Sequence, residues 1–233
     1  MIEAKNITKK FGSKTVLKDL NIKVNAGEIF CLLGANGAGK TTLINIFLNF
    51  ISADSGKAYI NNIDVEKHPS DSKKHLAYIP ENLMLYPYLT GIENLKYFTN
   101  LAGKKYTKEE LELFLSEAGL QKNYIHKRVS VFSKGMRQKV GIAIALAKNA
   151  KVLLLDEPTS GLDLKSAKEF ADILKKLKAG NVAVLMTTHD LFRAKETGTD
   201  IGILKDGKLI DKFVSEEINY DTLEKLYINH IKI

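Results

Sequence analysis

Residues 34–41 read Gly34-Ala35-Asn36-Gly37-Ala38-Gly39-Lys40-Thr41 and match the pattern G-x-x-x-x-G-K-[ST] at every fixed position. In such a loop the backbone N–H groups approach phosphate oxygens, the lysine reaches the β- and γ-phosphates, and the hydroxyl reaches Mg²⁺. The helix expected from about 40 to 50 contains no carboxylate, although a surface helix normally favours acids in its first turn. The loop and this helix start are therefore predicted to bind a nucleotide phosphate.

Apolar runs flank this loop and recur later in the chain. Residues 29–33, 152–155 and 182–187 show no polar alternation, which is typical of strands covered on both faces in a parallel sheet. Alternation over 20–24 instead predicts half-buried antiparallel strands within residues 2–64. The predicted fold class is α/β: a P-loop NTPase core with a mainly parallel sheet and an antiparallel β subdomain.

The middle of the chain has a helical character. Two T-x-x-E sequences, at 90–93 and 107–110, match the capping box that begins many helices. We therefore predict an α-helical subdomain at 82–150, inserted into a nucleotide-binding core that is formed by 1–81 and 151–233.

Polar side chains follow two of the apolar runs. Asp156 and Glu157 come directly after 152–155, where two adjacent carboxylates are unfavourable unless a cation and a reacting water use them. Asp156 is predicted to bind Mg²⁺ together with Thr41, and Glu157 to polarise the attacking water; two solvated acids are the alternative. Ligand groups lie at the carboxyl ends of parallel strands, so His189 is predicted to contact the γ-phosphate rather than to be purely structural.

A second candidate anion site begins at Ser133. This serine is a good N-cap for a helix that runs to Lys148, yet the first turn carries Lys134 and Arg137 rather than acids. A cationic helix start suits an anion. Because residues 34–41 already bind the nucleotide of this chain, the second site is best explained by the nucleotide of another subunit.

Together these motifs resemble the ATP-binding subunit of an ABC transporter over essentially all 233 residues. Phe132-Ser-Lys-Gly-Met136 stands in place of the signature Leu-Ser-Gly-Gly-Gln, and Ser160-Gly-Leu-Asp163 matches the loop after the Walker B strand. The resemblance implies a Mg²⁺-dependent ATPase that sandwiches two ATP molecules in a head-to-tail homodimer, with Lys40, Glu157 and His189 as catalytic residues. The nucleotide-binding residues it implies are Phe11, Gly34, Asn36, Gly37, Ala38, Gly39, Lys40, Thr41, Thr42, Ser133, Gly135 and Asp163. Phe11 would stack on adenine, or alternatively belong to the core.

Several positions depart from the family pattern. Lys134 and Met136 replace glycine and glutamine in the signature, a form that is similar to the ABC-2 exporter subfamily. Glu81, in Tyr78-Ile-Pro-Glu81, replaces the glutamine of the Q-loop. The resemblance therefore implies that a carboxylate, rather than an amide, contacts Mg²⁺ or its water at residue 81.

Composition narrows the range of partners. The net charge is +8, but only three arginines occur and the lysines are mixed with acids, so nucleic acid is not an expected partner. No apolar run approaches the roughly 18–20 residues of a membrane span, and no signal-like leader or disulfide framework is present. We expect a cytoplasmic protein, peripheral on the inner face of the cell membrane.

The segment 83–89 is strongly apolar although it is expected to be a loop. An apolar surface loop marks an interaction site, here for the integral membrane permease that the resemblance implies; folding into the subdomain's own core is the alternative. A soluble ABC ATPase without a membrane partner, such as one of iron–sulfur cluster assembly, is the alternative function.

Overall fold

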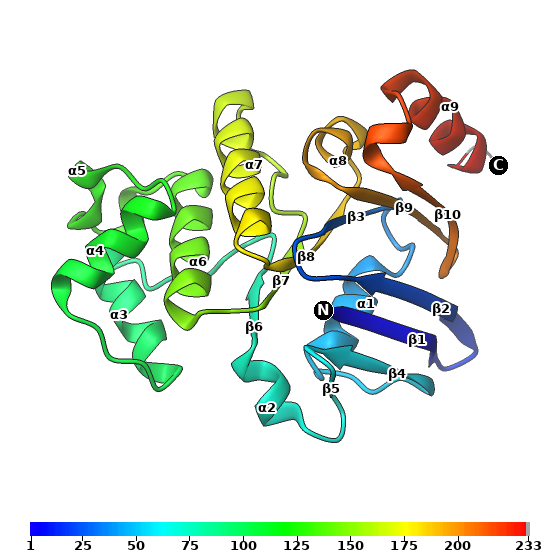
Figure 1. Ribbon diagram of the computed structural model, residues 1–233, viewed down its shortest axis with the longest axis horizontal. Coiled ribbons are helices and arrows are strands. Elements are labelled where there is room, and N and C mark those ends of the chain that lie inside the picture. Colours follow the sequence, from blue (N-terminus) through cyan, green and yellow to red (C-terminus); the bar gives the residue numbers. More distant parts are fainter. Residues whose placement is uncertain (232–233) are drawn as a thin grey trace.

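The protein contains two β-sheets with helices between and around them, and the computed structural model describes residues 1–231 (Figure 1). The larger sheet has the strand order β10-β9-β3-β8-β7-β6. All of its neighbouring strands are parallel except β10, which pairs with β9 in antiparallel fashion. Its strands are β3 (Ile29–Leu33), β6 (Leu76–Ile79), β7 (Val152–Asp156), β8 (Ala183–Thr188), β9 (Asp200–Lys205) and β10 (Lys208–Val214).

The smaller sheet is antiparallel, with the strand order β2-β1-β4-β5. Its strands are β1 (Ile2–Phe11), β2 (Lys14–Val24), β4 (Ser55–Ile60) and β5 (Ile63–Asp64). Helix α1 (Lys40–Phe47) packs between this sheet and the larger one, and its Leu43 and Phe47 are fully buried. The predicted helix after the loop thus exists, but it ends at Phe47 rather than near residue 50.

Every residue of β3 is buried, as expected for a strand covered on both faces. Phe30 and Leu32 join the apolar core beneath the smaller sheet, whereas Ile29, Cys31 and Leu33 face the opposite core. Helices α6 (Lys134–Lys148), α7 (Leu164–Ala179) and α8 (Leu191–Thr197) cover that opposite side. Cys31 is fully buried in this core, and its burial raises the pKa of the thiol.

Helices gather at one end of the molecule, shown in green in Figure 1. Both predicted capping boxes form: Thr90 caps α3 (Gly91–Leu101) and Thr107 caps α4 (Lys108–Glu117), each with its partner glutamate. Short elements complete this part and the chain that leads to β6. They are α2 (Pro69–Lys74), α5 (Lys122–Ile125) and η1 (Val129–Val131).

After β8 the chain forms β9 and β10, and the turn between these strands contacts the glycine loop at 34–41. The elements η2 (Ser215–Glu217) and α9 (Tyr220–Ile231) follow. Between β9 and β10, Gly207 has a φ of +81° and donates its N–H to the carbonyl of Ala38 at 3.2 Å. Its own carbonyl accepts from Lys18 of β2 at 2.9 Å. This turn therefore connects the glycine loop to the smaller sheet. Within residues 1–231, no helix has both the length and the apolar character to cross a membrane.

Candidate functional site

The glycine loop lies between the carboxyl end of β3 and α1. Gly37 and Gly39 have φ values of +84° and +112°, in a region that side chains rarely adopt, and a Cβ on Gly39 would lie 2.7 Å from Leu17 Cδ2. Helix α1 begins without an acidic residue in its first turn or a side-chain cap, so its first N–H groups have no side-chain acceptor. The loop thus has the backbone shape and the electrostatic polarity that a phosphate requires.

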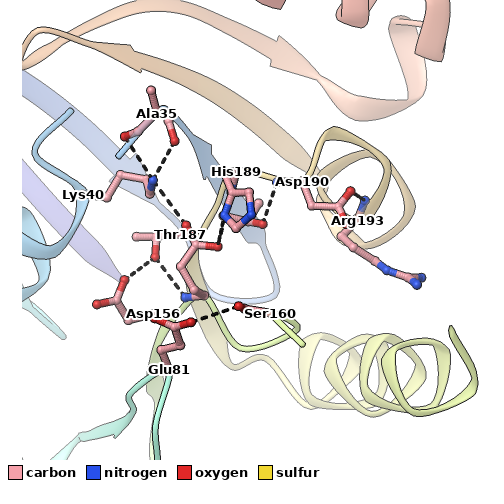
Figure 2. A network of polar contacts seen from close by, with 12 residues as sticks. Ala35, Lys40, Glu81, Asp156, Ser160, Thr187, His189, Asp190 and Arg193 are labelled. Carbon is pink, nitrogen blue, oxygen red and sulfur yellow. Dashed lines mark hydrogen bonds and ion pairs between the residues drawn. The ribbon is translucent and has the colours of Figure 1, made fainter. Parts of the chain in front are cut away.

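Lys40 turns back into this loop. Its Nζ donates to the carbonyls of Gly34 at 2.6 Å and Ala35 at 3.3 Å, and it lies 3.2 Å from Glu157 Oε1 (Figure 2). Only 6% of the lysine side chain is exposed. A buried ammonium group is therefore fixed beside the loop and beside the carboxylate that follows β7.

Asp156 is fixed by two hydroxyl groups. Thr41 Oγ1 donates to Asp156 Oδ2 at 3.1 Å, and Thr187 Oγ1 donates to Asp156 Oδ1 at 2.6 Å. The register explains the second contact, because Asp156 of β7 is paired with Thr187 of β8. The structure thus brings the predicted pair Thr41 and Asp156 together. Asp156 also affects Tyr78 on β6: burial of this tyrosine and the Asp156 charge raise the pKa of Tyr78 to about 12.

Glu157 follows in an unusual backbone conformation, with a φ of +46°. Its N–H donates to the carbonyl and the hydroxyl of Thr187, at 3.1 and 3.2 Å. Although Glu157 Oε1 is near the Lys40 ammonium, the geometry is not that of a hydrogen bond, so this buried oxygen has no donor among the described residues. A carboxylate held beside a phosphate loop fits a base that accepts a proton from a reacting water.

His189 lies beside Glu157 at the same edge of the sheet. Its Nδ1 is 2.8 Å from Glu157 Oε2, and its backbone N–H donates to the same oxygen at 3.3 Å. The histidine side chain is 57% exposed, so it is not a core residue. Its neighbour Asp190 caps α8 by accepting from the N–H of Arg193, which anchors this loop.

Glu81, two residues beyond β6, makes its contacts elsewhere. Ser160 Oγ donates to Glu81 Oε1 at 2.9 Å, and Lys134 Nζ lies 3.9 Å from the same oxygen (Figure 2 shows the first contact). Among residues 1–231, no hydrogen bond joins Glu81 to Thr41 or Asp156. Its predicted contact with Mg²⁺ stays a prediction.

The other predicted nucleotide contacts lie at helix starts. Ser133 Oγ accepts from the N–H of Met136 at 3.3 Å and so caps α6, as predicted. Asp163 caps α7 by accepting from the N–H and hydroxyl of Ser166, which holds the Asp163 pKa below its usual value. Gly135 packs on the same serine, because a Cβ there would lie 3.2 Å from Ser166 Cβ. The start of α6 thus contacts the start of α7, and neither contacts the side chain of Lys40.

Phe11 and Thr42 complete the predicted set. Phe11 is 51% exposed at the end of β1, which makes the core alternative wrong, and the Lys9 ammonium lies 5.4 Å from the centroid of its ring. Thr42 follows Thr41 in the first turn of α1 and is half-buried.

Sequence reasoning missed Thr187 and Ser160. Thr187 could have been found, because it is a hydroxyl residue directly at the end of an apolar strand that neighbours β7. Ser160 gave no such signal, since its partner Glu81 is 79 residues away in the chain.

The donor set also fits a hard cation. Mg²⁺ prefers oxygen ligands and is commonly held by one or two protein groups, with phosphate and water supplying the rest. Thr41 and Asp156 offer such a pair, and within residues 1–231 no group of three or more His, Cys, Asp or Glu residues could hold a metal alone.

Comparisons with known proteins lead to the same family as this geometry. The family model of the ABC transporter matches residues 17–160. The chain belongs to the ABC transporter family. It is 39% identical to the uncharacterized ABC transporter ATP-binding protein YhcH of Bacillus subtilis (strain 168), over 91% of this chain and 69% of that protein. It is 31% identical to the lantibiotic transport ATP-binding protein SrtF of Streptococcus pyogenes, over 99% and 97% of the two chains.

Solved ABC structures confirm the predicted fold class. An ATP-binding subunit of an ABC transporter aligns with a TM-score of 0.87 and 29% identity, covering 100% of both chains. A dimeric, post-hydrolysis ATP-binding cassette with bound ADP and Pi aligns with a TM-score of 0.81 and 29% identity, covering 92% of this chain and 99% of that one. The chain is thus an ABC-type ATPase subunit that binds nucleotide, as the sequence predicted.

Proposed function

We propose that this chain hydrolyses ATP with Mg²⁺ in a head-to-tail dimer of two identical subunits and thereby drives a membrane permease. The observation that carries the proposal is the convergence of Lys40, Thr41, Asp156 and Glu157 at the carboxyl ends of β3 and β7. Mg²⁺, when bound, would neutralise charge on the β- and γ-phosphate oxygens.

In this proposal each residue of the site has one role in binding or hydrolysis. The loop N–H groups and Lys40 bind the phosphates, Thr41 and Asp156 hold the cation, and Phe11 stacks on the base. Glu157 accepts the proton of the attacking water. His189, whose Nδ1 contacts the other Glu157 oxygen, orients that carboxylate and reaches the γ-phosphate.

The partner subunit supplies the second half of the site. Ser133, Gly135 and Asp163 lie at the starts of α6 and α7, where N–H groups and a cationic first turn suit an anion. Since these starts contact each other rather than Lys40, the nucleotide of the second subunit is the anion they fit. A dimeric relative with bound ADP and Pi supports this arrangement.

A groove between the helical end and the core supports a permease partner. It has a volume of about 440 Å³. It is lined by the 83–84 segment, α3 and α6, including Met84, Phe98 and Ile144, and also by residues 48, 50, 73 and 76–78. The apolar segment 83–89 is divided: Leu85 is buried and Leu83 packs on the core, whereas Met84 and Tyr88 are each 82% exposed. The segment thus divides its side chains between the core and the surface, and the exposed residues fit an apolar helix of a membrane protein.

We propose export as the direction of transport. The Ser133-Lys134-Gly135-Met136 signature is of the ABC-2 form. Relatives include proteins named for lantibiotic transport and for linearmycin resistance. This also favours a membrane partner, and a location at the inner face of the membrane, over a soluble ABC ATPase. Co-purification with integral membrane proteins rather than soluble scaffold proteins separates the two.

The decisive experiment replaces Glu157 by glutamine, which keeps the shape but removes the base. We expect turnover to fall by roughly 10²–10⁴-fold, as is usual for a general base, while ATP still binds and dimers accumulate in gel filtration with Mg²⁺. Glu196→Gln is a matched control, because Glu196 pairs with Arg193 on α8. Near-normal turnover of Glu157→Gln would overturn the catalytic assignment, and absence of ATP-dependent dimers would overturn the shared site.

A further inference from the structure

Glu81 contacts two other parts of the chain through one oxygen. Oε1 accepts from Ser160 Oγ at 2.9 Å and lies 3.9 Å from Lys134 Nζ. Ser160 belongs to the loop between β7 and α7, three residues after Glu157, and Lys134 is the first residue of α6. We call Glu81, Lys134 and Ser160 the Glu81 clasp. It joins the end of β6, the loop that leads to Asp163, and the helix that Ser133 caps.

Two further contacts hold the same three parts together. Gln138 lies one helical turn after Lys134, on the same face of α6, and its Nε2 donates to the backbone carbonyl of Glu81 at 3.5 Å. The start of α6 also packs closely on the start of α7, since a Cβ on Gly135 would lie 3.2 Å from Ser166 Cβ and 3.7 Å from Leu162 Cδ2. The clasp therefore closes a junction that is already tightly packed.

The two charged members of the clasp compensate each other. Glu81 and Lys134 are the positions where this chain carries a carboxylate and an ammonium group in place of the neutral glutamine and glycine of the family pattern. Lys134 is only 23% exposed at its side chain, and Glu81 is 45% exposed. Among residues 1–231, no other carboxylate forms an ion pair with Lys134. Within the described residues the ion pair of Lys134 is thus with Glu81, and its separation and exposure make it a weak one.

We propose that Glu81 and Lys134 are positioning residues that align the α6 start with the 160–163 loop, and that Glu81 does not bind Mg²⁺. This inference rests on the proposed function, in which Ser133, Gly135 and Asp163 together face the nucleotide of the second subunit. A clasp between their two elements fixes the spacing of these groups before the dimer closes. Its loss slows hydrolysis in the dimer but leaves ATP binding to the loop of the same chain intact.

The test is a double-mutant cycle on steady-state ATP hydrolysis by the full chain, with Lys134→Met, Glu81→Gln and both changes together. We expect each single variant to lower kcat by roughly two- to fivefold, the size of a partly exposed ion pair, with KM for ATP nearly unchanged. The double variant should be no slower than the slower single variant, because the second change removes a charge that has already lost its partner. Lys134→Arg should retain kcat, since it keeps the positive charge.

A matched pair on the same helix separates positioning from simple helix attachment. Lys139 of α6 forms an ion pair with Glu169 of α7 at 2.6 Å, away from the predicted site. We expect Lys139→Met and Glu169→Gln to leave kcat unchanged. If these controls lost as much kcat as Lys134→Met, the effect would come from general packing of α6 on α7 rather than from the Glu81 clasp, and the proposal would be overturned.

Titration with Mg²⁺ decides the role of Glu81. We expect the apparent Mg²⁺ affinity of Glu81→Gln to equal that of the wild type; a several-fold weaker affinity would assign Glu81 to the metal and overturn the proposal. Independent, multiplicative losses in the cycle would overturn it as well, while the proposed function stands. A wild-type chain without ATP turnover would overturn both.

Discussion

Thr187 Oγ1 donates a hydrogen bond of 2.6 Å to Asp156 Oδ1 across neighbouring strands β8 and β7. The same hydroxyl accepts from the backbone N–H of Glu157 at 3.2 Å. One threonine thus orients the predicted Mg²⁺ ligand and supports the left-handed backbone of the predicted base. Conformations of this kind persist where surrounding contacts hold them, and they often occur at functional sites.

Replacing this hydroxyl by a methyl group should therefore affect both stability and turnover. Thr187→Val keeps the shape but leaves a buried carboxylate oxygen without its donor, so we expect a loss of about 1–3 kcal/mol in the free energy of unfolding and a lower kcat. Thr99→Val is a matched control, because Thr99 is also buried and donates to the carbonyl of Lys96, in α3. Urea unfolding and ATPase assays distinguish them: equal stability loss with equal turnover would contradict the role of Thr187.

Local patterns explain why much of the site could be predicted from the sequence. Residues 34–41, the apolar strands and the two capping boxes each depend on neighbours within one element, so the sequence alone indicates their conformation. Asp156 and His189 were placed at one edge because the carboxyl ends of parallel strands meet there. Contacts of this kind follow from strand order.

Contacts between irregular segments could not be predicted in this way. Glu81 and Ser160 both lie outside strands and helices, so no register relates them, and their contact depends on how α6 and α7 pack. The same holds for the segment 83–89, where a loop without periodicity divides its side chains between core and surface. Such details require the tertiary structure.

The turn at Gly207 offers a test of how the glycine loop is supported. A Cβ at this residue would lie 2.2 Å from the Val16 carbonyl oxygen at a φ of +81°. We expect Gly207→Ala to lose roughly 1–2 kcal/mol for the left-handed backbone, and about 1–3 kcal/mol more because the strand must move. It should also weaken ATP binding, because the Gly207 N–H supports Ala38.

Gly12→Ala is the control for backbone conformation alone. Gly12 has a φ of +58°, yet a Cβ there meets nothing within 4 Å. We expect only the loss of about 1–2 kcal/mol that the backbone conformation implies. Chemical denaturation of both variants measures the difference, and equal losses would contradict the predicted clash at Gly207.

Alkaline pH should reveal the environment of Tyr78. Burial and the nearby Asp156 charge raise the pKa of Tyr78 to about 12 in the folded chain, against a value near 10 for an unfolded tyrosine. The unfolded state therefore loses this proton first, so the folded state becomes less stable as the pH rises from about 10 to about 12. Below pH 10 both states keep the proton and Tyr78 contributes no pH dependence.

Tyr78→Phe removes this titration. Unfolding free energies measured at several pH values should decline less steeply for the variant than for the wild type between pH 10 and 12, since the lysines titrate alike in both. Tyr59→Phe, on β4 of the smaller sheet, serves as the comparison for loss of a tyrosine elsewhere. Parallel curves for the wild type and Tyr78→Phe would contradict the raised pKa.

The last prediction concerns the shared site. Ser133→Arg places a bulky charge at the start of α6, so we expect it to abolish ATP hydrolysis while the affinity of the monomer for ATP stays unchanged. Loss of affinity in the isolated monomer would mean that Ser133 belongs to the nucleotide site of its own chain. Lys40→Met has the opposite defect, because it removes the ammonium group that contacts the glycine loop.

Mixing these two inactive variants should restore activity. In a mixed dimer the intact loop of the Ser133→Arg chain faces the intact Ser133 of the Lys40→Met chain, so one of its two composite sites is complete. A two-fold interface presents the same patch from both chains, so equal amounts of the two variants pair at random and about half of the dimers are mixed. Because one of the two sites in each mixed dimer is complete, we expect about a quarter of wild-type turnover. A mixture as inactive as its components, with dimers present in gel filtration, would contradict a site built from two subunits.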